Sequence, residues 1–80
     1  MDRALWKQHL EFADRHVAVA ERIVAAQKQI LAELQRDGHA TELADRILKA
    51  YEEVLELHIE DRERLKKELA TAGATHGRLG

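Results

Sequence analysis

Hydrophobic residues recur every seven positions through the first half of the chain, a spacing that puts them on one side of an α-helix. The rows are His9, His16, Ile23, Ile30; Leu10, Val17, Val24, Leu31; and Trp6, Ala13, Ala20, Gln27, Leu34, with Leu5, Phe12, Val19 and Ala26 beside the first row. At 3.6 residues per turn these rows cover an arc of about 160°, which is wider than one neighbouring helix can bury. The first helix therefore needs at least two neighbours.

The second half of the chain repeats this spacing. Its rows are Ala44, Tyr51, His58, Leu65; Leu48, Leu55, Arg62, Leu69; and Ile47, Val54, Asp61. They are rich in leucine until they reach Asp61 and Arg62. A second long amphipathic helix is therefore predicted, with a polar interruption in its later part.

Helix-ending signals gather at one internal place, the sequence Asp37-Gly38-His39-Ala40-Thr41. Gly38 suits a left-handed helix end, Thr41 suits the N-cap of a new helix, and Asp2 suits the N-cap of the first. The pattern predicts a helical hairpin over residues 1–72, with a helix at about 2–36, a turn at 37–41, a helix at about 41–72 that Gly73 ends, and a flexible tail at 73–80.

The short turn makes the two helices antiparallel, so that residues whose numbers add to roughly 78 should lie at the same height. This rule pairs Ile23 with Leu55 and Ile30 with Leu48. It also brings opposite charges together: Arg15 with Glu63, Arg22 with Glu56, and Arg36 with Glu42. We interpret these pairs as determinants of register rather than of stability, because exposed ion pairs contribute at most about 1 kcal/mol.

The composition favours an all-α fold that completes its core by self-association. The chain has 80 residues, no proline, four glycines and 35% charged residues. A chain this short is near the lower limit for an independent hydrophobic core. We predict that two long antiparallel two-helix hairpins dimerise into a four-helix bundle, with a self-association core of Val17, Ile23, Val24, Ile30, Leu31, Leu34, Leu48 and Leu55.

Charge and motif content argue against several classes of function. The formal net charge of −2 gives no general attraction to nucleic acid, and no apolar run is long enough for a membrane span or signal peptide. The chain has neither cysteine nor serine, and it has no phosphate-binding glycine loop. We therefore expect a cytoplasmic homo-oligomer with no enzymatic activity, no cofactor, and no nucleic-acid or membrane partner, while an unidentified protein partner remains open.

A polar layer interrupts the predicted core, and its members are His9, His16, His58, Asp61 and Arg62. The height rule places His16 opposite Arg62, with His58 and Asp61 within about one turn. One interpretation is a set of hydrogen-bonded core residues that fix register. Others are an assembly that weakens on acidification, and a metal site of His16, His58 and Asp61, although His9 and His16 lie about 10.5 Å apart along the helix and so cannot easily share an ion.

The chain resembles, at a set of positions, a group of short uncharacterised bacterial proteins that are seen especially in alphaproteobacteria. The resembling positions are His16-Val17, Glu21-Arg22-Ile23, Gln27, Ile30, Leu34, Asp37-Gly38-His39-Ala40-Thr41, Ala44, Leu48, Glu53, Leu55, His58 and Arg62-Glu63-Arg64-Leu65. The resemblance spans residues 9–69. It implies a bacterial cytoplasmic helical hairpin and supplies no activity.

Two hypotheses of function follow. The first is a self-associating interaction or scaffold module. The alternative is a helical bundle that binds a metal or a small ligand through an inward-facing histidine layer.

Overall fold

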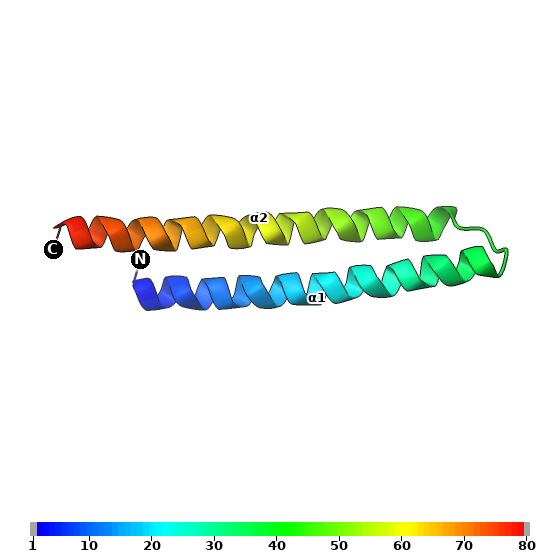
Figure 1. Ribbon diagram of the computed structural model, residues 1–80, viewed down its shortest axis with the longest axis horizontal. Coiled ribbons are helices and arrows are strands. Elements are labelled where there is room, and N and C mark those ends of the chain that lie inside the picture. Colours follow the sequence, from blue (N-terminus) through cyan, green and yellow to red (C-terminus); the bar gives the residue numbers. More distant parts are fainter. Residues whose placement is uncertain (1, 80) are drawn as a thin grey trace.

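The computed structural model contains two long helices, α1 (Arg3–Arg36) and α2 (Glu42–Leu79), joined by a short turn. It describes the backbone of residues 2–79 and the side chains of residues 2–71. The helices run antiparallel side by side in a rod of 65 × 14 × 14 Å, and the end of α2 projects beyond the start of α1 (Figure 1). No strand occurs in the described residues, which confirms the predicted all-α helical hairpin.

Local signals in the sequence set both ends of α1. The Asp2 carboxylate accepts a hydrogen bond from the Ala4 backbone N–H at 2.9 Å and caps the first turn, as predicted. At the other end Gly38 has a φ of 74°, the left-handed conformation that glycine adopts without strain. The His39 N–H then donates to the Leu34 carbonyl and the Gly38 N–H to the Gln35 carbonyl, the paired bonds of a Schellman motif.

The second helix does not end where the sequence predicted. The prediction stopped it at Gly73, whereas α2 continues to Leu79, so the backbone of the predicted flexible tail is helical over residues 73–79. Gly80 lies outside the described residues. A glycine costs about 1 kcal/mol relative to alanine inside a helix, but it can take helical dihedral angles, and no proline follows it.

Small side chains from α1 fill the seam between the two helices. Ala13, Val17, Ala20 and Val24 are buried there, facing Ala44, Leu48 and Leu65 of α2. Small side chains let two helices approach closely, and they leave little room between them for larger residues. The larger apolar residues of α1 therefore lie beside the seam.

This arrangement divides the predicted self-association core. Val17, Val24 and Leu48 are buried within one chain, so they stabilise the hairpin itself and are unavailable to a second copy. Leu31, Leu34 and Leu55 are half-buried. Ile23 and Ile30 are 43% and 47% exposed, since their row lies to one side of the seam.

Gln27 is the buried polar residue of the seam. Its side-chain amide donates a hydrogen bond to the Ala44 carbonyl at 3.1 Å and so joins α1 to the first turn of α2. A buried amide is costly without a partner, and this bond forms at one relative height of the helices. Gln27 therefore contributes to the register as well as to stability.

The observed register differs from the predicted one. His16 lies against His58, with ring centroids 5.3 Å apart, which agrees with the predicted nearness of these two residues, whereas Arg62, the predicted opposite of His16, pairs with Asp14. The displacement is about one helical turn. Among the described side chains none of the predicted Arg–Glu pairs forms, because Glu63 pairs within its own helix, Arg36 lies near Asp37, and the Arg15 guanidinium lies over the Phe12 ring.

The Gly38 turn can be tested by substitution. We expect Gly38→Ala to lower the free energy of unfolding by about 1 kcal/mol, because a side chain disfavours the left-handed conformation. No atom lies within 4 Å of the added Cβ, so the cost is one of backbone conformation alone. Urea unfolding measures it, and Gly38→Asn should lose less because asparagine tolerates this conformation. Equal losses in the two variants would contradict this account.

The Gln27 bond has a matched control in Gln29, an exposed residue of the same type two positions along α1. We expect Gln27→Ala to lower the free energy of unfolding by about 1–2 kcal/mol, because it removes a buried hydrogen bond and leaves a void. Gln29→Ala should change it by less than about 0.5 kcal/mol. Equal effects in thermal unfolding would show that the interhelical bond does not contribute.

Candidate functional site

One long side of the hairpin is apolar and exposed. An open groove of about 330 Å³ runs between the helices there, lined by His16, Val19, Ala20, Ile23, Val54 and His58. Residues three, four or seven positions away lie on the same side of a helix, so the same surface continues from Val19 and Val54 toward the turn. We call this surface the apolar strip and define it as Val19, Ile23, Ala26 and Ile30 of α1 with Leu43, Ile47, Ala50, Val54 and Leu57 of α2.

The large side chains of the apolar strip are poorly covered by the hairpin. Val54 is 46% exposed and Leu57 is 63% exposed. Toward the open end of the hairpin, Leu5 and Phe12 continue the α1 row and are also exposed. Large contiguous patches of exposed apolar surface are typical of interaction sites in proteins generally.

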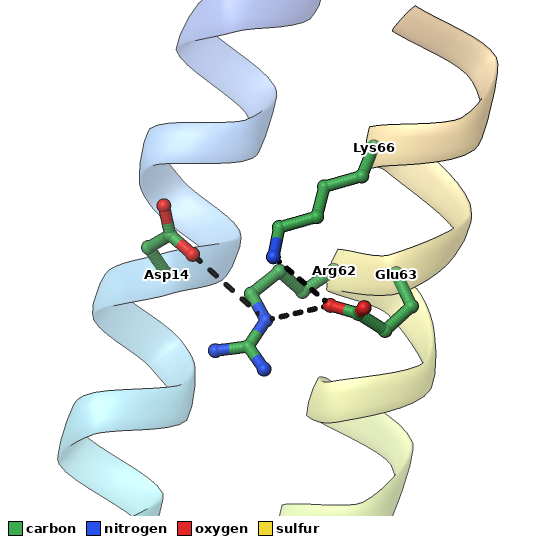
Figure 2. A network of polar contacts seen from close by, with 4 residues as sticks. All are labelled: Asp14, Arg62, Glu63 and Lys66. Carbon is green, nitrogen blue, oxygen red and sulfur yellow. Dashed lines mark hydrogen bonds and ion pairs between the residues drawn. The ribbon is translucent and has the colours of Figure 1, made fainter. Parts of the chain in front are cut away.

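A charged network lies across the seam (Figure 2). The Nε atom of Arg62 on α2 lies 3.9 Å from the Oδ1 atom of Asp14 on α1. Glu63 accepts from the Arg62 Nε at 3.1 Å, and the Lys66 Nζ lies 3.3 Å from the same Glu63 oxygen. Hydrogen bonds from Lys66 and then Arg62 lower the pKa of Glu63 below its ordinary value of 4.5. In the part of the chain whose side chains are described, Arg62 with Asp14 is the only ion pair between the helices.

The structure separates Arg62 from the other four residues of the predicted polar layer, which line two open grooves. His16 and His58 lie together beside the apolar groove, with ring planes inclined by 55°. His9, His16 and Asp61 line a second open groove of about 230 Å³ with Phe12 and Arg64. Arg62, by contrast, joins the charged network, and none of the five predicted layer residues is fully buried in the single chain.

Asp61 is held by an ion pair within its own helix. The Arg64 guanidinium hydrogen-bonds the Asp61 carboxylate one turn away, and this bond raises the pKa of Arg64. Within the described residues no three histidine, aspartate or glutamate side chains lie close enough to hold a metal ion. The geometry thus supplies a histidine pair and a neutralised carboxylate instead of a preformed ligand set.

The aromatic residues near the open end pack against polar neighbours. The Trp6 and His9 rings meet edge to face with centroids 6.2 Å apart. The Arg15 guanidinium lies 4.7 Å above the centre of the Phe12 ring, within range of a cation–π interaction. Trp6 is half-buried, so the packing within the hairpin covers part of its side chain and leaves the rest exposed.

The predicted self-association core omitted several residues of the apolar strip, namely Val19, Ala26, Leu43, Ile47, Ala50, Val54 and Leu57. The sequence did contain a signal for four of them, because Val19 and Ala26 belong to the flanking row of α1, and Ile47 and Val54 belong to a row of α2. What periodicity could not show was which row the partner helix of the same chain would cover. The structure shows that α2 covers the rows of α1 that contain Ala13 and Val17.

The chain matches no protein-family model, no curated protein and no solved structure. In the described residues no helix has a stretch long and apolar enough to cross a membrane. The case for a function therefore depends on the geometry of the hairpin surface.

The Glu63 ion pairs predict a pH dependence of stability. A carboxylate whose pKa is lower in the folded state stabilises the fold at pH values above its unfolded pKa, and this contribution is lost as the pH falls through the folded pKa. We expect the melting temperature of Glu63→Gln to fall less than that of the wild type between pH 7 and pH 3, at one protein concentration. Glu56→Gln, two turns earlier on α2, is the control. An unchanged acid-induced fall in Glu63→Gln would contradict the assignment.

Proposed function

We propose that this protein is a self-associating interaction module whose hairpins pair through the apolar strip to form a homodimer. The observation that supports this most directly is the position of Ile23, Ile30, Val54 and Leu57, which are large and apolar but exposed on one side of the chain. Burial of apolar side chains drives both folding and association. A second copy of the hairpin supplies the neighbours that each helix lacks.

The total surface of the chain supports an unfilled interface. The hairpin exposes 6127 Å². A compact protein of this mass exposes about 4,900 Å², or about 1,200 Å² less. A standard protein interface buries about 800 Å² on each partner. The surplus is therefore large enough for a specific dimer.

The chemistry of the apolar strip favours a second copy over a charged partner. No member of the strip is charged, so it offers nothing to select an acidic or basic surface. The formal net charge of −2 is small, and two copies repel each other weakly. The charged network of Asp14, Arg62, Glu63 and Lys66 would remain in water when the strip is covered.

Pairing through the strip produces the four-helix bundle that the sequence predicted, and a dimer of this kind can offer its outer surface to a further protein. A cytoplasmic, non-enzymatic role follows as part of the same proposal. The alternative of a metal- or small-ligand-binding bundle stays a prediction, and no observation on the described residues favours it.

The apolar strip can be tested with two neighbouring substitutions. We expect Ile23→Asp to convert the dimer to a monomer, because it places a charge in the middle of the strip. Ala25→Asp is the matched control: residue 25 is exposed, and two residues along a helix correspond to about 200° of rotation, away from the strip. Sedimentation equilibrium measures the mass of each variant. A dimeric Ile23→Asp protein, or a wild-type monomer at micromolar concentration, would overturn the proposal.

A further inference from the structure

The apolar residues of the strip are arranged nearly symmetrically about the middle of each row, by residue type on α2 and by spacing on α1. On α2 the order is Leu43, Ile47, Ala50, Val54, Leu57, which is large on both sides of a central alanine. On α1 the order Val19, Ile23, Ala26, Ile30 has spacings of four, three and four, which are identical when reversed. The α2 row is centred at residue 50 and the α1 row between residues 24 and 25.

These two centres lie within one helical turn of the same height in the rod, because the residue numbers of the interhelical contacts Gln27–Ala44, His16–His58 and Asp14–Arg62 add to between 71 and 76. The contact of His16 with His58 sets the local register, and the same register brings residue 24 of α1 level with residue 50 of α2. Two independent helices could have placed their centres at different heights. One axis perpendicular to the rod therefore passes near the centre of symmetry of both rows.

We propose that two hairpins associate antiparallel about a two-fold axis at this height, so that α1 packs on α1 and α2 on α2 of the second copy. This inference rests on the proposed self-association. Rotation about the axis pairs Leu43 with Leu57 and Ala50 with Ala50, and it brings Ile47 within one residue of the level of Val54. On α1 it pairs Val19 with Ile30, and the large Ile23 with the small Ala26, as close packing requires.

The polar half of the same side also fits this arrangement. Beyond Leu57 the α2 row continues as Asp61 and Arg64. In the single chain Asp61 is half-buried and Arg64 is exposed. Antiparallel pairing leaves them at the edge of the contact, level with the turn of the second copy. There Asp61 lies level with His39 and His16 level with Glu33 of the second copy, which are complementary pairs.

The other two symmetric arrangements place charges against apolar surface. A parallel dimer packs α1 on α2 of the second copy and sets Asp61 and Arg64 against Phe12. An antiparallel dimer centred on Val19, the middle of α1, still packs α2 on α2 and sets Asp61 against Ile47 and Ala50 of the second copy. Removing such charges from water is expensive unless each meets a partner. The axis at Ala50 covers apolar residues with apolar residues.

The chain contains no cysteine, so single cysteines report the arrangement directly under mild oxidation. We expect Ala50→Cys to form a covalent dimer. Phe12→Cys should not, because its two copies would lie about 37 Å apart along the rod. Leu43→Cys and Leu57→Cys should each remain mostly uncrosslinked alone, since their copies lie about 21 Å apart, but an equimolar mixture of the two should cross-link between them.

Sedimentation of the wild type and of each variant in reductant separates the two proposals. A wild-type monomer overturns the self-association and this inference with it. A dimer in which Ala50→Cys fails to cross-link, while a mixture of Ala26→Cys and Ala50→Cys succeeds, shows a parallel arrangement and overturns the inference alone. A dimer in which Leu57→Cys cross-links by itself also overturns it, because the axis is then displaced toward the middle of the rod.

Discussion

The hairpin depends on one constraint: two helices share a single seam, and an apolar arc wider than that seam cannot be buried by it. The chain fills the seam with small residues from α1, mainly Ala13, Val17, Ala20 and Val24. Their size brings the helices close together and keeps Ile23, Ile30 and Phe12 outside. The exposed apolar strip is thus a direct result of how the seam is packed.

Polar interactions have a limited but specific role in this framework. Gln27 joins the helices through the Ala44 carbonyl inside the seam, whereas the charged residues mostly pair with neighbours one turn away on their own helix. Local pairs require little ordering of the chain, and interhelical pairs between exposed side chains gain little in water. The register is therefore set by packing and by one buried amide more than by surface charge.

Both the fold and part of the site could be predicted from sequence. Asp2 and Gly38 act as the expected helix ends, because their effects are local and depend on backbone geometry at one position. The predicted height rule placed His16 opposite Arg62, but His16 lies against His58, about one turn away, and Arg62 pairs with Asp14. A rule based on turn length cannot resolve such a shift, because opposite charges recur along both helices and many registers appear complementary.

The sequence by itself determined that this protein is two amphipathic helices joined at Gly38, since periodicity, caps and the absence of proline act within a few residues. It also showed that each helix has more apolar surface than one neighbour can cover. Only the tertiary structure decided which part of that surface is buried and which remains exposed. That choice depends on side-chain packing across the seam, which places Val17 and Val24 inside and Ile23 and Val54 outside, and such packing involves residues far apart in the chain.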